Sequence, residues 1–187
     1  MPSRYLQETG SFMASEALIK LAFLNCPEKE SLAYAWLADT AGTIHDRQGH
    51  GHLALEFDQD ALKIQIGKSP SGSVDLANSY SAVGFQLTSL WQAMEGVEYQ
   101  NKAIDNSPTD HDGKLKFNPD RYLRNRARSY FIDGKYEDSK IDLKNAEYWQ
   151  TLIHGKDSHY HGECVTLSAE AKLWNAHLCC LTSLHTC

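Results

Sequence analysis

The sequence predicts an α+β protein, in which a small antiparallel sheet from the first half of the chain packs against an amphipathic C-terminal helix. Residues 52–57 and 61–66 alternate between apolar and polar side chains, which is typical of half-buried strands, and turn-like residues 58–60 lie between them. Residues 163–184 carry apolar side chains close to the helical period, which predicts the helix.

The remaining elements follow from short apolar runs separated by turn residues. Glycine, proline and serine mark loops over 39–51, 69–78 and 106–119, and no internal repeat is evident. Asp142 is a candidate N-cap for one of the helices. Further strands are predicted at 17–25, 31–37, 80–87, 129–132 and 139–143. A short helix also fits 31–37, and Gly84 would form a bulge in the strand at 80–87. Further helices are predicted at 88–94, 121–131 and 143–153.

The composition is that of an ordinary globular protein. The chain has 187 residues, of which 42% are hydrophobic and 22% charged, so a single domain over 1–187 is expected. The net charge of −6 argues against a nucleic-acid partner. The sequence contains neither a run of about 18 apolar residues nor a secretory signal, which predicts a cytoplasmic protein or one secreted without a cleaved signal peptide.

One of the five cysteines is a candidate nucleophile. Cys164 opens the predicted C-terminal helix, where free N–H groups and the helix dipole favour the thiolate. The alternative is an inert cysteine buried in the core. No CxxC pair is present, so the sequence indicates neither a zinc ribbon nor a thioredoxin motif.

His52 is a candidate base. It shares the polar face of its predicted strand with Glu56, and a two-residue hairpin loop would pair it with Gln65, which could orient the imidazole. The alternative is an ordinary surface histidine.

A Gly51-His52 strand start, followed much later by a cysteine that opens a helix, resembles the permuted papain-like enzymes. These are the circularly permuted relatives of the NlpC/P60 peptidases and include the lecithin:retinol acyltransferase-like group. The resemblance implies that Cys164 is the nucleophile, His52 the base and Gln65 its orienting residue, with Tyr160 and the Cys164 N–H stabilising the oxyanion. Members often have Asn before the cysteine, where this chain has Glu163. Residues 88–141 match nothing in the family and are expected to form an insertion or lid.

The predicted function is therefore cysteine-dependent hydrolysis or acyl transfer by an amidase or peptidase, without a cofactor. The substrate would be a peptide or acyl-amide, such as a cell-wall peptide of peptidoglycan reached by a secreted effector. Such an effector would have an inhibitor or immunity protein as its partner.

Two alternatives remain open. His45, His50 and His52, together with His159 and His161, are candidate ligands of a zinc hydrolase. The other alternative is a non-catalytic interaction or immunity-type protein, for which four tryptophans and nine tyrosines supply binding surface.

Overall fold

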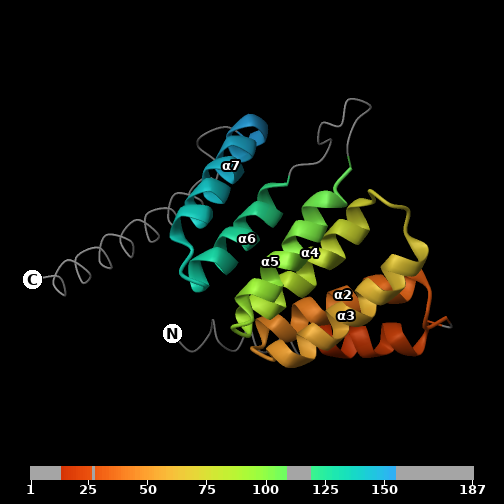
Figure 1. Ribbon diagram of the computed structural model, residues 1–187. Coiled ribbons are helices and arrows are strands. Elements are labelled where there is room, and N and C mark those ends of the chain that lie inside the picture. Colours follow the sequence, from red (N-terminus) through yellow and green to blue (C-terminus); the bar gives the residue numbers. More distant parts are fainter. Residues whose placement is uncertain (1–13, 27, 109–118, 155–187) are drawn as a thin grey trace, which may run out of the picture.

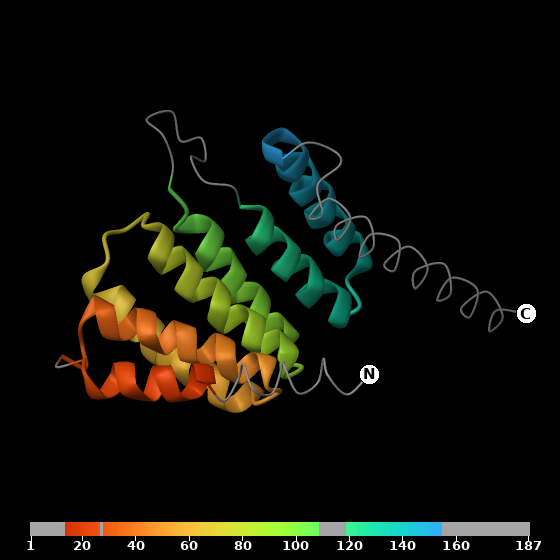
Figure 2. The same ribbon diagram turned by 180° about the vertical axis from the view of Figure 1, so that it is seen from behind.

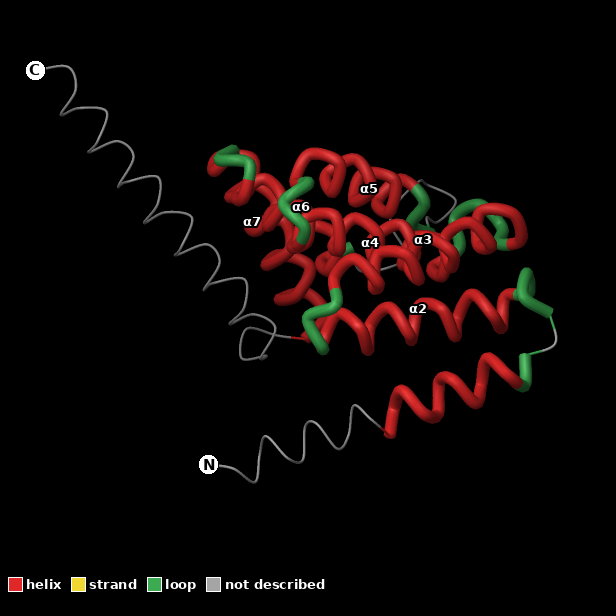
Figure 3. The backbone as a smooth tube through the Cα atoms, turned by 90° about the horizontal axis from the view of Figure 1, so that it is seen from below, coloured by secondary structure: helices red, strands yellow, loops and turns green. Residues whose placement is uncertain are grey.

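The computed structural model describes residues 14–26, 28–108 and 119–154, and within these ranges the regular structure is helical (Figure 3). No strand occurs there, so the predicted α+β fold with its small sheet is wrong. The predicted C-terminal helix over 163–184 lies outside the described residues. A helix over 14–24 comes first, followed by α2 (Leu32–Arg47), α3 (Gly51–Lys68), α4 (Val74–Ser89), α5 (Ala93–Asp105), α6 (Asp120–Ile132) and α7 (Tyr136–His154).

Within the described residues, the helices from α2 to α7 form three antiparallel hairpins stacked side by side in chain order (Figures 1 and 2). Hairpin 1 consists of α2 and α3, hairpin 2 of α4 and α5, and hairpin 3 of α6 and α7. The second helix of each hairpin packs on the first helix of the next, and α4 also contacts both α2 and α6. The three first helices therefore form one layer of a helical array.

The first helix of every hairpin ends in the same way. The second residue after the helix takes a left-handed conformation at Gly49 (φ 79°), Trp91 (φ 66°) and Gly134 (φ 78°). Its N–H donates to the carbonyl three residues back, and the next N–H donates to the carbonyl five residues back. This is the Schellman motif, which satisfies the last carbonyls of the helix. The motif recurs after 42 and 43 residues, so the chain does contain an internal repeat.

Trp91 occupies a turn conformation that favours glycine, and its side chain is 81% exposed. A non-glycine residue in the left-handed region costs about 1–2 kcal/mol. Trp91→Gly is therefore expected to raise the free energy of unfolding by about 1 kcal/mol in urea denaturation. Gly134→Ala, at the equivalent turn, is the opposite control and should lower stability by a similar amount. Equal stability of Trp91→Gly and the wild type would contradict a strained turn.

Small residues recur where the two helices of each hairpin approach. Seven residues before the turn residue stand Gly42, Gly84 and Ala127, and five residues after it stand Ala54, Gly96 and Ser139, all buried. A Cβ on Gly84 would lie 3.0 Å from the Gly96 carbonyl oxygen, and a Cβ on Gly96 would lie 2.9 Å from that of Gly84. Side chains larger than these would hold the helices of hairpin 2 apart.

The predicted strand pair 52–57 and 61–66 lies within the single helix α3. Its buried residues are spaced 4, 3, 1 and 3 apart, which is the helical period. Two of them are polar, two are alanine and one is Leu62, while Leu53 of the predicted apolar face is 39% exposed. The buried residues are Ala54, Asp58, Ala61, Leu62 and Gln65.

The other predicted strands are helical as well. Residues 17–25 lie almost wholly in the helix over 14–24, 31–37 begins α2, 80–87 lies in α4, 129–132 ends α6, and 139–143 lies in α7. The helix predicted over 121–131 is confirmed by α6.

Apolar contacts join each hairpin to its neighbours. Leu62 of α3 packs with Leu76, Val83 and Leu87 of α4, and Tyr122 of α6 packs with alanines of α4 and α5. Phe23 joins the helix over 14–24 to hairpin 1. The centre of its ring lies 5.0 Å from that of Tyr34 and 6.0 Å from that of Phe57.

The single-domain expectation stays a prediction, as does the insertion or lid over 88–141, a range that includes α5 and α6. Among the described residues, none of the helices combines the length and apolar character needed to span a membrane.

Candidate ligand-binding groove

A pocket of about 280 Å³ opens where the first helices of the three hairpins meet. Its walls come from α2, α4 and α6, and a residue of α3 lies at its base. Residues far apart in the sequence therefore converge there because the hairpins stack.

The α2 side of the pocket is acidic. Asp39 and Asp46 lie two helical turns apart on α2, and Asp58 reaches the pocket from α3. Asp58 is only 2% exposed, and its Oδ1 has no hydrogen-bond partner. A Cβ added to Gly42 would have this same oxygen as its nearest neighbour. Gly42 thus leaves the space that the Asp58 carboxyl occupies.

Burial and neighbouring charge keep Asp58 protonated at neutral pH. Burial raises its pKa to about 8, the Asp39 charge adds to this rise, a hydrogen bond from Gln86 opposes it, and Asp46 raises it further. Burial also raises the pKa of Asp39, while Arg121 acts in the opposite direction. The negative charge on this side of the pocket therefore comes from the two aspartates of α2, while Asp58 is neutral.

The α6 side of the pocket is basic. Arg121 is exposed and donates from Nη2 to Asn78 Oδ1 on α4 at 2.7 Å, and the Tyr122 hydroxyl donates to the same oxygen at 2.8 Å. Two turns further along α6, the Arg128 guanidinium lies 5.2 Å from the centre of the Phe85 ring, a cation–π contact. The charge of the groove thus changes sign from α2 to α6.

Buried hydrogen bonds hold the middle of the groove. Ser81 of α4 donates to Gln100 Oε1 at 2.9 Å, and Gln100 Nε2 returns a bond to the Ser81 carbonyl at 2.9 Å. Asn125 of α6 donates to the Ser81 hydroxyl at 3.1 Å, and the Thr88 and Ser129 hydroxyls share a bond of 2.7 Å. The bonds of Asn125 and Ser129 join hairpin 3 to hairpin 2, and Ser81 and Asn125 themselves line the pocket.

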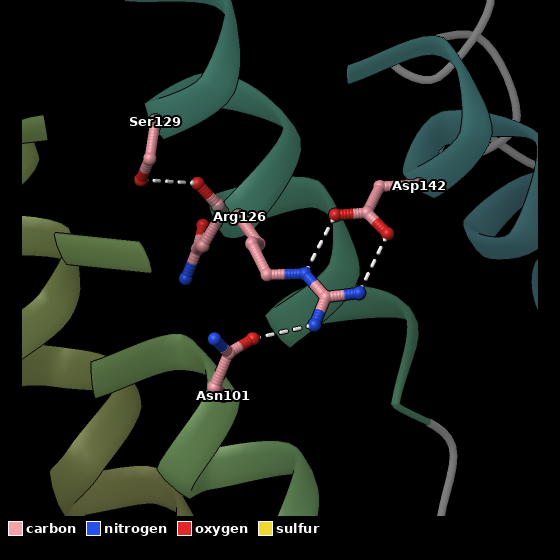
Figure 4. Close-up of polar contacts among 5 residues, drawn as sticks. Asn101, Arg126, Ser129 and Asp142 are labelled. Atoms are coloured by element: carbon pink, nitrogen blue, oxygen red, sulfur yellow. Dashed lines mark hydrogen bonds and ion pairs between the residues drawn. The ribbon is translucent and has the colours of Figure 1, made fainter. Parts of the chain in front are cut away.

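Arg126 fixes α6 from its other side (Figure 4). Its Nε and Nη2 donate to the two carboxylate oxygens of Asp142, each at 2.7 Å, and its Nη1 donates to Asn101 Oδ1 at 2.6 Å. The bond with Asp142 is the main cause that raises the pKa of Arg126. Asp142 lies within α7 and is not the N-cap that the sequence predicted.

The predicted catalytic residues are not brought together within the described chain. His52 is exposed near the start of α3, and Gln65 is buried thirteen residues further along the same helix, about 20 Å away at the helical rise. The predicted cross-strand pairing of His52 with Gln65 is therefore wrong. Gln65 Oε1 instead accepts a bond from the Ser69 hydroxyl. Cys164 and Tyr160 lie outside the described residues, so their positions stay predictions.

The histidines do not form a metal site in the described ranges. The rings of His45 and His50 are 5.8 Å apart, but no group of three or more His, Cys, Asp or Glu side chains there is arranged to hold a metal ion. His159 and His161 lie outside the described residues.

Sequence reasoning missed the residues that line the groove. Asp39 and Asp46 carried a usable signal, because a spacing of seven places two residues on one face of a helix. Asp58 carried none, since the sequence interpretation assigned it to a hairpin turn.

Solved structures resemble the chain over nearly its whole length. A Podosopora anserina protein assigned as a kinesin light chain with nearly identical TPR-like repeats has a TM-score of 0.66 at 14% identity, covering 93% of this chain and 83% of that one. A singly substituted variant of that protein gives 0.68 with the same identity and coverage. BtubC (BKLC) from P. vanneervenii gives 0.67 at 16% identity, covering 91% of this chain and 72% of that one.

The fold is a TPR-like helical repeat array. The spacing of 42 and 43 residues between its turns is longer than the roughly 34 residues of a TPR unit. Neither a protein-family model nor a curated protein sequence matches the chain. At these identities the likeness establishes the fold alone.

The TPR-like fold overturns the papain-like resemblance. A permuted papain-like enzyme needs a sheet to carry its histidine, and His52 lies on a helix in an array without strands in its described part. The predicted thiol hydrolase, whether amidase, peptidase or acyltransferase-like enzyme, is therefore wrong, as is the link to peptidoglycan that followed from it.

Proposed function

We propose that the chain is a protein-interaction module that binds an extended segment of a partner protein along the layer of α2, α4 and α6. The observation that carries this proposal is the pocket where all three hairpins meet, with aspartates on one side and Arg121 of α6 on the other. Helical repeat arrays use such extended surfaces for binding. The proposal agrees with the non-catalytic alternative that the sequence left open.

The groove suits a short peptide. Packed helices lie about 8–10 Å apart, so three of them span roughly 20 Å, the length of about six extended residues. Peptides of about 12 residues would cover the groove in any register.

A screen of random peptides of about this length tests the proposal. We expect the wild-type chain to enrich peptides that the double variant Arg121→Glu/Arg128→Glu no longer binds, because that variant reverses the charge of the α6 side. The control Lys63→Glu/Lys144→Glu makes the same change in charge at exposed lysines outside the pocket and should keep the binding. Circular dichroism would verify that all variants remain helical.

Two outcomes would contradict the proposal. One is the absence of enriched peptides, and the other is equal enrichment by the groove variant and the wild type.

A further inference from the structure

We infer that an apolar stripe on the outer side of α7 is the docking surface for residues 163–184 of the same chain, which pack on it as the first helix of a fourth hairpin. The stripe does not line the pocket of the groove, so this docking is independent of the proposed function.

Helix α7 is apolar on two opposite sides. Its buried side includes Leu143 and Ala146, and Ala146 packs against Leu123 of α6. The other side carries three large apolar side chains that are more than half exposed, namely Ile141 (58%), Tyr148 (63%) and Leu152 (62%). Spacings of seven and four residues place these three in one stripe along the helix.

The stripe lies where the array of hairpins would continue. The second helices of hairpins 1 and 2, α3 and α5, each pack on the first helix of the next hairpin. Helix α7 is the second helix of hairpin 3, and among the described helices it packs on α6 at the end of the array (Figure 1). The terminal unit of a helical repeat array needs a polar outer face for solubility. The apolar stripe of α7 therefore indicates that a further helix covers it.

The sequence that follows α7 suits this place. It predicts a helix over 163–184, in which five apolar residues are spaced 4, 3, 4 and 3 apart and so share one side. At the helical rise they extend over about 21 Å, enough to cover the stripe of about 16 Å on α7. These residues are Leu167, Ala171, Trp174, Leu178 and Leu181.

The connection and the repeat spacing also fit a fourth hairpin. Residues 155–162 join α7 to the predicted helix, a stretch longer than 69–73 between α3 and α4 and shorter than 106–119 between α5 and α6. Ala169 follows Ala127 by 42 residues, just as Gly84 follows Gly42. The small residue expected where two helices of a hairpin approach is therefore present at the right point of the sequence.

A second copy of the chain is the other occupant that the test must exclude. The helix over 14–24, beside hairpin 1 at the other end of the array, exposes Leu18, Leu21 and Leu24, so two copies could join end to end. Residues 163–184 are favoured because a short connection holds them near α7 in every molecule, which gives them a high effective concentration.

Photochemical cross-linking of the full-length chain tests the inference. Tyr148→p-benzoylphenylalanine places a photoreactive group in the stripe, and mass spectrometry of the digested product identifies the segment that it joins. We expect a link to the range 163–184 in a product with the mass of one chain. The control Lys63→p-benzoylphenylalanine, at an exposed residue of α3, should give no link to that range.

Two variants with the same change in net charge show whether apolar docking makes the contact. Trp174→Glu/Leu178→Glu places carboxylates on the apolar side of the predicted helix and should lower the yield of the cross-link at least about tenfold. Lys172→Glu changes the opposite side and should keep the yield. Circular dichroism would verify that the variants remain helical.

Three outcomes would overturn the inference. A link between two molecules would make the stripe a contact between copies of the chain. The absence of a link to 163–184 would leave this segment away from α7. Equal yields from the double variant and the unsubstituted segment would show that the tethered segment meets the stripe without docking there.

Discussion

Replacing Gly96 by alanine is expected to lower the free energy of unfolding by about 2 kcal/mol. The new Cβ would lie 2.9 Å from the Gly84 carbonyl oxygen and would also press on the Thr88 hydroxyl. Thr88 cannot move aside freely, because it donates to Gly84 at 2.8 Å and shares a bond with Ser129. Overpacking with contacts this short costs up to about 3 kcal/mol, and the better helix propensity of alanine offsets about 1 kcal/mol of it.

Gly67→Ala is the matched control, and urea denaturation is the measurement for both variants. Gly67 also lies in a helix, α3, but a Cβ there would meet no atom within 4 Å. This variant should gain up to about 1 kcal/mol, because alanine lowers the entropy of the unfolded chain. If Gly96→Ala were as stable as Gly67→Ala, the close contact between α4 and α5 would be refuted.

Asp58→Asn is expected to stabilise the protein, by an amount that grows with pH. The pKa of Asp58 is about 8 in the folded protein and near 4 in the unfolded chain. At a pH between these two pKa values, the folded state holds a proton that the unfolded state has released. The free energy of unfolding therefore falls as pH rises and levels off above about pH 8. Asparagine cannot ionise and removes this loss, which is on the order of 2–4 kcal/mol near pH 8.

Urea denaturation at about pH 5 and about pH 8 measures the effect, with Asp60→Asn as the control because Asp60 is exposed. We expect the difference between Asp58→Asn and the wild type to be small at the lower pH and large at the higher. The same difference at both pH values would show that Asp58 ionises normally. The groups that face Asp58 are Asp39 and Asp46 on α2 and Gln86 on α4.

The sequence predicted some local features correctly. Residues 121–131 are helical, because a charged helix depends mainly on nearby residues. Period-two patterns misled elsewhere. In α3 the buried residues are two alanines, two polar residues and Leu62, so the buried face follows the helical period and not the apolar alternation over 53–57.

The repeat was hidden for a related reason. What recurs is a set of small residues and a left-handed turn, and in hairpin 2 the turn residue is Trp91 where the other hairpins have glycine. The groove was also beyond local reasoning. Asp58 is buried because α2 supplies Gly42 and α4 supplies Gln86, and only the stacking of hairpins brings these three segments together.

The hydrogen bonds between hairpins 2 and 3 have a consequence for the thermodynamics of binding. Bonds such as those of Asn125 with Ser81 and of Arg126 with Asn101 are directional, so they restrict the rotation of α6 against α4 and α5. The position of the α6 arginines relative to α4 and α5 is thereby set before any ligand arrives. Binding then loses little conformational entropy on the protein side, and most of the ordering cost falls on the peptide. Selectivity among peptides should therefore depend on the spacing of their own charges.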